Sequence, residues 1–150
     1  MDRIDKAILR VLQRSADASV DVISGEVGLS HTPVWRRIRR MEQDGVILGR
    51  YCKLDRKRLG LDVVMIASIK LGRLDEPALV EFEDAVRNIP EVQDCYSMTG
   101  SFDYMLKIVT GSVEGYELLL KKKISHLPHL QGITSALVLR EVKQTEALPI

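Results

Sequence analysis

Four arginines lie within five positions of the segment SHTPVWRRIRRMEQDG, residues 30–45, next to the only tryptophan of the chain. A guanidinium group can hold a phosphate through two parallel hydrogen bonds. The whole chain is almost neutral, with 22 Lys+Arg against 21 Asp+Glu, so this positive charge is locally concentrated. The segment is therefore either an ordinary solvated helix face or a surface that binds the phosphates of a nucleic acid.

The apolar residues of this segment predict a helix with one buried side. Val34, Ile38 and Met41 fall within a narrow stripe at the helical angle of about 100° per residue. Ser30 is a favourable N-cap, and Gly45 is a favourable residue to end the helix. We therefore expect a helix over most of the segment, with its polar residues on the surface.

Most of the positive charge lies on the opposite side of this predicted helix, with Arg37 nearer the core. No acid stands at the helical spacing that would neutralise Arg36 or Arg37, whereas Glu42 and Asp44 could pair with the later arginines. Half-buried packing explains the tryptophan without a functional role. For the arginines, an ordinary solvated helix surface remains the alternative to DNA binding. The predicted DNA-binding residues are His31, Thr32, Trp35, Arg36, Arg37, Arg39, Arg40 and, in the next segment, Arg50.

Two shorter helices must position the arginine-rich one. Apolar residues at helical spacing predict the first helix after the N-cap Asp2 and the second over 20–27, and Gly28 suits a tight turn. Two short helices, a turn and a third helix form a helix-turn-helix unit, whose last helix enters the major groove of DNA. The segment 46–54 is expected to be a strand or small wing.

The rest of the chain has a different pattern and the opposite charge. Residues 1–60 carry 13 Lys+Arg against 8 Asp+Glu, and residues 61–150 carry 9 against 13. Strand and helix patterns after residue 60 follow the order β-α-β-β-α-β, which is the ferredoxin-like arrangement. We predict an α+β protein with a winged helix-turn-helix DNA-binding domain over 1–53, a hinge over 54–60, and an effector-binding and oligomerisation domain over 61–150.

Both faces of the predicted sheet are apolar, although two helices can cover only one of them. On the first strand Val63 and Met65 point one way, and Val64 and Ile66 point the other. The simplest explanation is a second subunit that packs sheet to sheet. A two-fold dimer would also present two recognition helices to a symmetric DNA site.

Composition and motifs argue against several other classes of protein. The longest apolar run covers residues 63–67, far below the ~20 residues that span a bilayer. Cys52 and Cys95 stand outside any metal or redox motif and are expected to be free thiols in a reducing cytoplasm. No nucleophile has a base beside it, and His126 and His129 make only a weak metal motif. We expect no catalytic residue, no metal site, no cofactor and no membrane contact.

The sequence resembles the Lrp/AsnC family of transcription factors (leucine-responsive regulatory protein / asparagine regulator). The residues that carry the resemblance span almost the whole chain in the family's order: MDRIDKAIL, VGLSHTPVWRRIRRMEQDGVI, LDRKRLGL, PEVQDCYSMTGSFDYMLKIV and LREVKQTEALPI. The second helix departs from the family pattern at Ser24 and Gly25, which lowers its expected rigidity. The resemblance implies double-stranded DNA as a partner and homodimers that commonly assemble into octamers.

The turn at residues 98–104 is the expected effector site. Taken alone, Gly100 and Asp103 would suit an ordinary hairpin turn with a local hydrogen bond. The resemblance implies that this Gly-x-x-Asp-Tyr turn lines a pocket between subunits where an amino acid binds. The predicted effector-binding residues are Met98, Thr99, Gly100, Asp103 and Tyr104, with Thr134 and Ser135 as polar companions on the last strand.

We therefore expect a sequence-specific transcriptional regulator that responds to a small effector, most simply an amino acid. The alternative is a ligand-sensing oligomer that acts through protein partners instead of DNA.

Overall fold

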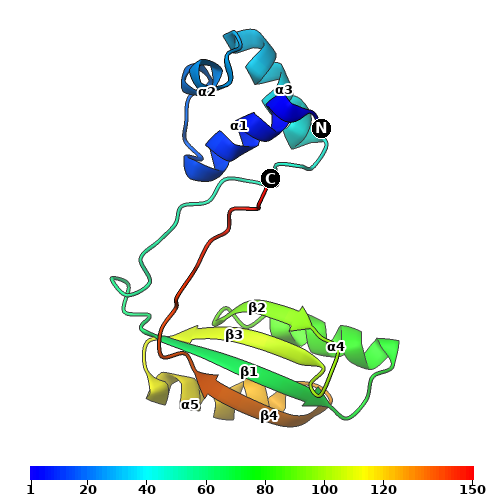
Figure 1. Ribbon diagram of the computed structural model, residues 1–150. Helices are drawn as coiled ribbons and strands as arrows, with labels where there is room; N and C mark the ends of the chain where they lie inside the picture. The colour runs from blue at the N-terminus through cyan, green and yellow to red at the C-terminus, as the bar shows by residue number, and fades with distance from the viewer. The chain divides into compact units, whose positions relative to one another are not determined.

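The computed structural model describes all residues, 1–150. The chain divides into two compact units (Figure 1). The first unit contains Met1–Lys53 together with Lys143–Ile150, and the second contains Leu54–Val142. The residues of the predicted hinge thus belong to the second unit, and the last eight residues of the predicted effector domain belong to the first. No helix is both long enough and apolar enough to cross a membrane.

The first unit is built from three helices: α1 (Arg3–Arg14), α2 (Val20–Val27) and α3 (His31–Gln43). Asp2 and Asp5 form a reciprocal capping box at the start of α1, and the Ser19 hydroxyl accepts a hydrogen bond from the third residue of α2. Gly28 adopts a left-handed conformation with φ of 70°, which lets the chain turn from α2 into α3. The buried apolar core consists of Ile8, Leu9, Val11, Ile23, Val34, Ile38 and Met41.

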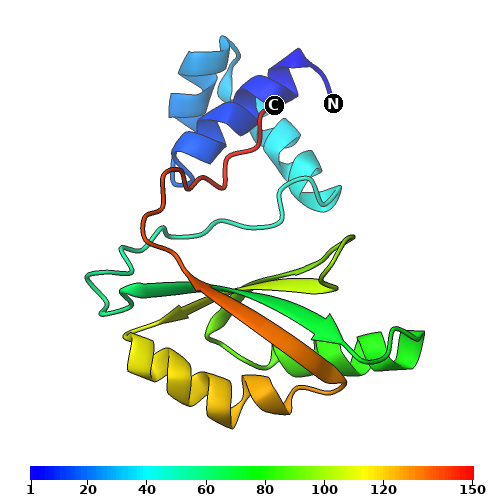
Figure 2. The same cartoon turned by 60° about the horizontal axis from the view of Figure 1, so that its bottom comes forward.

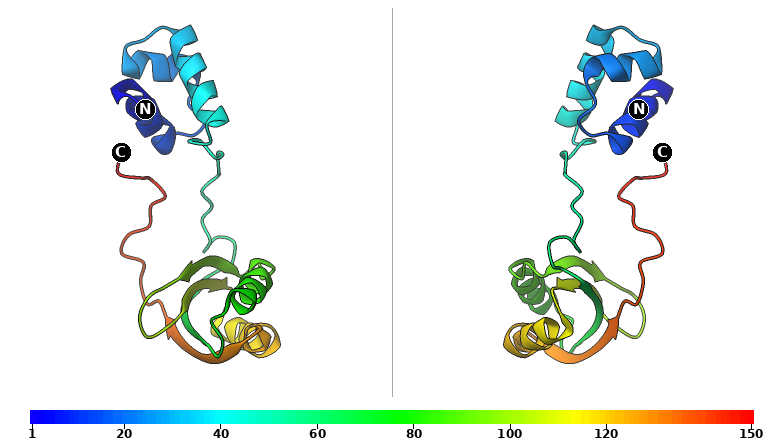
Figure 3. Two further views of the ribbon diagram at one scale, coloured as in Figure 1. Left: turned by 90° about the vertical axis from the view of Figure 1, so that its right-hand side faces the viewer. Right: turned by 90° about the vertical axis from the view of Figure 1, so that its left-hand side faces the viewer.

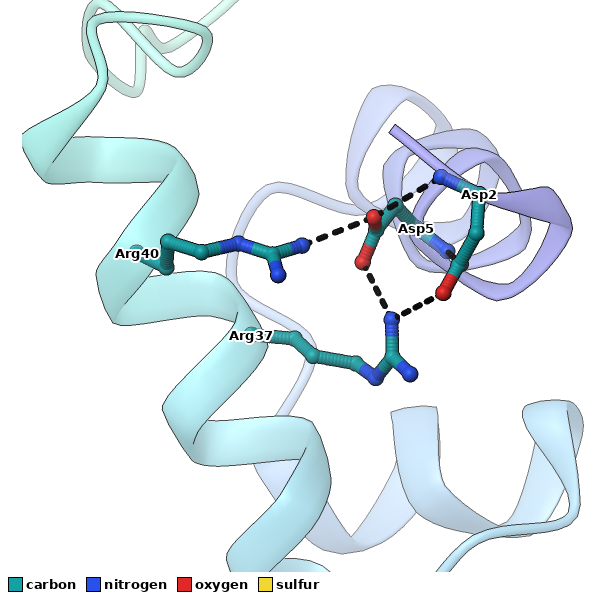
Figure 4. Close-up of polar contacts among 4 residues, drawn as sticks. All are labelled: Asp2, Asp5, Arg37 and Arg40. Carbon is teal, nitrogen blue, oxygen red and sulfur yellow. Dashed lines mark hydrogen bonds and ion pairs between the residues drawn. The ribbon is translucent and has the colours of Figure 1, made fainter.

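A buried carboxylate joins α1 to α3 (Figure 4). The Asp5 residue is only 1% exposed, and its two oxygens lie 2.7 Å from Arg37 Nη1 and 2.7 Å from Arg40 Nη2. Arg37 Nη1 also lies 2.7 Å from a carboxylate oxygen of Asp2. We call these four residues the Asp5 cluster. The ion pairs link the N-cap and the first turn of α1 to the middle and last turns of α3, so the cluster fixes the angle between the two helices.

The Asp5 cluster keeps its carboxylates ionised. Burial by itself raises the pKa of Asp5, but the hydrogen bonds from the Asp2 N–H and Arg37 and the charge of Arg40 hold that pKa below the ordinary aspartate value. The Asp5 N–H and the Arg37 guanidinium lower the pKa of Asp2 to about 2. Burying an ionised carboxylate is unfavourable unless it is paired and hydrogen-bonded, and here both conditions hold.

The expected wing does not form a strand. After α3, the segment 46–54 is irregular, and Leu48 and Tyr51 are 88% and 83% exposed. No other strand lies in the first unit to pair with it. A strand needs a neighbour for its backbone hydrogen bonds, so the alternation of apolar residues alone was not sufficient. The turn that follows ends at Gly60, which has φ of 71°.

The second unit has the predicted β-α-β-β-α-β order. Its strands are β1 (Val63–Leu71), β2 (Val92–Ser97), β3 (Tyr104–Thr110) and β4 (Leu130–Leu137), and its helices are α4 (Glu76–Arg87) and α5 (Val113–Lys122), followed by a short 3-10 turn, η1 (Ile124–His126). The antiparallel sheet has the order β2-β3-β1-β4. Both helices cover the same face of this sheet (Figures 2 and 3).

The core of the second unit lies between the sheet and its two helices. Phe82 of α4, Ile69 of β1 and Leu106 of β3 are completely buried there. Because side chains alternate along a strand, the neighbours of these residues point to the face without helices. On that open face Val64 is 3% exposed and Ile66 is half-buried, whereas Tyr96 is 51% exposed.

The Asp5 cluster predicts an acid-sensitive first unit. Because the pKa values of Asp2 and Asp5 are lowered on folding, their contribution to stability is complete above the unfolded value and is lost as the pH falls through the folded values. We therefore expect the free energy of unfolding to decrease from about pH 4 down to about pH 2. Trp35, the only tryptophan, lies on α3 and reports this transition by its fluorescence.

The variant Asp5→Asn should lower the stability at pH 7 by about 2 kcal/mol, since hydrogen bonds to charged groups contribute about 1.5–3 kcal/mol and the freed arginines still reach water. It should also flatten the acid dependence. Asp21→Asn, in the first turn of α2, is the matched control and should change stability by less than about 0.5 kcal/mol. An acid profile of Asp5→Asn identical to that of the parent would contradict this assignment.

Candidate DNA-binding surface and effector site

The polar side of α3 is exposed as the sequence predicts. Val34, Ile38 and Met41 are buried, and His31 and Thr32 are exposed at the start of the helix. Ser30 occupies the N-cap position with an extended backbone, but its hydroxyl makes no capping hydrogen bond. The first backbone N–H groups of α3 therefore lack a side-chain cap, at the end of the helix where its dipole attracts anions.

Arg36 is the only arginine of α3 that makes no ion pair or hydrogen bond within the chain. Arg39 Nη1 lies 3.2 Å from Glu42, and its guanidinium stacks over the ring of Trp35 at 5.6 Å from the centroid. Arg50 lies 3.5 Å from the same glutamate. Trp35 is 46% exposed, so it serves as a platform for Arg39 while half of its surface faces solvent.

The structure corrects the expectation that no acid neutralises Arg37. Both Asp2 and Asp5 do so from α1, and Asp5 also pairs with Arg40, which was expected to pair within α3. Helical spacing within one segment cannot reveal a partner 32 to 35 residues away. The Arg37 side chain is 26% exposed and that of Arg40 is 53% exposed, so the first is mainly structural and the second remains partly accessible.

The turn between β2 and β3 brings Asp103 against the end of β1. Asp103 Oδ1 accepts a hydrogen bond from Lys70 Nζ at 3.0 Å, and Oδ2 accepts one from the Leu71 N–H at 2.8 Å. These two donors, the backbone N–H first, lower the pKa of Asp103. Gly100 has φ of 118°, a conformation that favours glycine, and Met98 and Thr99 beside it are exposed.

The structure divides the predicted effector residues between the two faces of the sheet. Tyr104 is 2% exposed on the helix side, where it packs against Phe82 and donates a hydrogen bond to Glu83 at 2.8 Å. Burial and then Glu83 raise its pKa to about 12. Ser135 also lies on the helix side, hydrogen-bonded to Tyr116.

Tyr104 also lines a cavity of about 360 Å³ between α4 and β2, together with Glu83 and Arg87.

Thr134 is exposed on the open face, and its neighbour on β1 is Ser68. Of the predicted effector residues, Gly100 and Asp103 thus lie together at the turn, whereas Tyr104 and Ser135 lie on the other face of the sheet.

Sequence reasoning did not include Lys70 among the effector residues. Its side chain is 40% exposed and stands next to Asp103, so the two present a positive and a negative charge side by side. The sequence pattern places Lys70 on the open face of the first strand, and this was the one signal that could have identified it. No group of three or more His, Cys, Asp or Glu side chains is arranged to hold a metal ion.

Two parts of the chain match models of known protein families. Residues 1–47 match the model of a winged helix-turn-helix DNA-binding domain, and residues 64–148 match the model of the Lrp/AsnC ligand binding domain. The chain is 39% identical to a proline dehydrogenase transcriptional activator of Rhizobium radiobacter, over 97% of this chain and 93% of that protein. It is 35% identical to the Bkd operon transcriptional regulator of Pseudomonas aeruginosa, over 100% and 98%.

Solved structures agree over the full length. An AsnC family transcriptional regulator from Agrobacterium tumefaciens superimposes with a TM-score of 0.95 at 36% identity, covering 99% of this chain and 97% of the other. A transcriptional regulator of Neisseria meningitidis, solved as a complex with L-Met, gives 0.94 at 28% identity, covering 99% and 96%. With both halves matched in order and relatives similar along the whole length, the chain belongs to the Lrp/AsnC family of transcriptional regulators.

Proposed function

We propose that this transcriptional regulator binds DNA through the exposed side of α3 and that an amino acid binding near Asp103 controls it as a homo-oligomer. The observation that carries the DNA-binding part is Arg36, an exposed guanidinium without an internal partner on the helix that a helix-turn-helix unit inserts into the major groove. The relatives of this chain are named as regulators and activators of transcription. The proposal assigns no catalytic step to the chain.

The proposed contacts follow from the charges that remain available. Arg36 reaches phosphate or a base edge without breaking an internal ion pair. Arg39 is positioned by Trp35. Arg39 and Arg50 must each give up an ion pair with Glu42 before they bind phosphate. His31 and Thr32 lie at the N-terminal end of the helix, where base contacts are made in helix-turn-helix proteins. We assign Arg37 a structural role and give Arg40 both roles.

The open face of the sheet supports a homodimer. Apolar residues on this face include Ile66 on β1 and Met105 and Val109 on β3, all of which are half-buried. A sheet face of this kind is covered in most folded proteins, and α4 and α5 already occupy the other face. We propose that a second copy covers it, and that such dimers associate further, to octamers as in the family.

The Lys70–Asp103 pair supports an amino acid as the effector. A free amino acid carries a carboxylate and an ammonium, which match the ammonium of Lys70 and the carboxylate of Asp103. Each carboxylate oxygen of Asp103 has one internal donor, so it can accept a further hydrogen bond. Gly100 lets a ligand approach the backbone closely, and Thr134 supplies a hydroxyl on the open face. The L-Met complex of the Neisseria protein supports this class of ligand.

Removal of Arg36 should weaken DNA binding without unfolding the protein. Against genomic fragments selected by the parent protein, Arg36→Ala should lower the affinity by about tenfold or more and reduce the salt dependence by about one phosphate contact. Mobility shift over a series of salt concentrations measures both quantities. Arg87→Ala on α4 is the matched control and should bind as the parent does. If an Arg36→Ala, Arg39→Ala variant binds equally well, the regulator acts through protein partners instead.

A charge on the open face should separate the subunits. Ile66→Asp should sediment at the monomer mass, because an unpaired charge buried between two sheets costs about 3 kcal/mol or more. Leu118→Asp on α5, where the leucine is 52% exposed, should sediment as the parent does. A parent chain that sediments as a monomer at micromolar concentration would rule out the dimer.

Loss of either charge near the turn should abolish effector binding. Calorimetry with each of the twenty amino acids should find at least one that binds the parent, and Lys70→Met and Asp103→Asn should each weaken it by about tenfold or more. Lys107→Met removes a lysine that lies 3.7 Å from Asp94 on the same sheet and should leave binding unchanged. The effector site is wrong if no amino acid binds the parent at millimolar concentration or if both variants bind like the parent.

A further inference from the structure

The C-terminal segment of the chain returns to the DNA-binding unit and contacts α1. Figures 1 and 2 show this segment, in red, ending beside α1. Residues 143–150 belong to the same compact unit as residues 1–53, whereas the intervening residues 54–142 form the other unit. The chain therefore connects the two units twice, once after α3 and once after β4.

Three kinds of contact hold this segment on α1. The Gln13 side-chain amide donates to the Leu148 carbonyl at 3.3 Å and accepts a hydrogen bond from the Leu148 N–H. Arg10 Nε donates to the main-chain oxygen of Ile150 at 2.7 Å. The Ile150 side chain is half-buried and packs against the apolar core of the first unit. Leu148 itself is 69% exposed, so the segment is recognised through its backbone and through one apolar side chain.

We propose that the surface of α1 around Arg10 and Gln13 is a docking site for the chain's own residues 146–150, which strap the DNA-binding unit to the end of the effector-binding unit. The paired hydrogen bonds of Gln13 reproduce those that a neighbouring strand would offer to an extended peptide, and they do not depend on its side chains. Specificity comes from Ile150, which packs partly buried against the apolar core, and from Arg10, which binds the main-chain oxygen of that residue.

The same chain is the occupant because its own backbone already leads there. A segment tethered within one molecule has an effective concentration far above that of a second copy, so a weak contact is sufficient. Two connections also restrict the orientations that the DNA-binding unit samples more than one connection does. Part of the entropy lost on DNA binding is then lost before the DNA arrives.

A thermodynamic cycle in the full chain tests the docking. Trp35 fluorescence during heating reports the unfolding of the first unit alone. Gln13→Ala, which leaves the charge unchanged, should lower the unfolding midpoint by about 4 °C. Deletion of residues 146–150 should lower it by at least as much, and Gln13→Ala should have no further effect in the deleted chain. Lys6→Ala, on α1 with no partner, is the matched control and should have the same small effect in both backgrounds.

Cross-linking identifies the occupant. In a chain carrying Cys52→Ser and Cys95→Ser, the added pair Arg14→Cys and Leu148→Cys leaves Gln13 and the backbone of residue 148 in place. This pair should react with a short bismaleimide within one chain and keep the monomer mass on a denaturing gel. A product of twice that mass would show that a second copy supplies the segment and would overturn the proposal. A deletion that leaves the midpoint unchanged, or a Gln13→Ala effect that persists in the deleted chain, would also overturn it.

Discussion

A single buried carboxylate, that of Asp5, determines the arrangement of the DNA-binding unit. It lies in the first turn of α1 and takes one guanidinium of α3 on each oxygen. The apolar core alone allows α3 to slide or rotate by small amounts, because apolar contacts are not directional. The charged hydrogen bonds of Asp5 prevent such movement of α3, because an unpaired carboxylate in this position is strongly unfavourable. The same contact also divides the four arginines of α3 into different roles.

Two of these arginines pair with the carboxylate of Asp5, and the other two lie on the exposed side of the helix. Arg37 is enclosed by Asp2 and Asp5, and its pKa is raised by them. Arg36 and Arg39 lie on the exposed side, the second against Trp35. The arginines of α3 thus make internal ion pairs with α1 on one side, and the exposed ones form the surface that we propose for phosphate. Neither alternative for the segment 30–45 included these ion pairs with α1, and phosphate binding by the exposed arginines stays a prediction.

The elements of the fold could be predicted from the sequence, because each depends on local signals. The capping box of α1, the left-handed Gly28, and the apolar stripe of Val34 and Ile38 all act within a few residues. The features that could not be predicted depend on distant partners. Asp5 meets Arg40 across 35 positions, Lys70 meets Asp103 across 33, and Gln13 meets Leu148 across 135. The segment 46–54 alternates like a strand and yet finds no neighbour.

The candidate effector site shows the same division. Gly100 and Asp103 are recognisable as a turn from their types and spacing, but the lysine that completes the charge pair lies on another strand. Tyr104 follows Asp103 directly, and the alternation of the strand still places it on the opposite face, in the core beside Phe82. Proximity in the sequence was therefore misleading for Tyr104, and distance in the sequence concealed Lys70.

The measurement that tests the central claim most directly is a double-mutant cycle between Asp5 and Arg37 in DNA binding over a series of salt concentrations. If Arg37 acts through Asp5, then Arg37→Gln should weaken binding with no change in the salt dependence. Asp5→Asn should then weaken binding by clearly less than it does in the parent, because only its contact with Arg40 is left to lose. If instead Arg37→Gln lowers the salt dependence by about one phosphate contact and the two effects add, Arg37 binds DNA directly, and the Asp5 cluster does not orient α3.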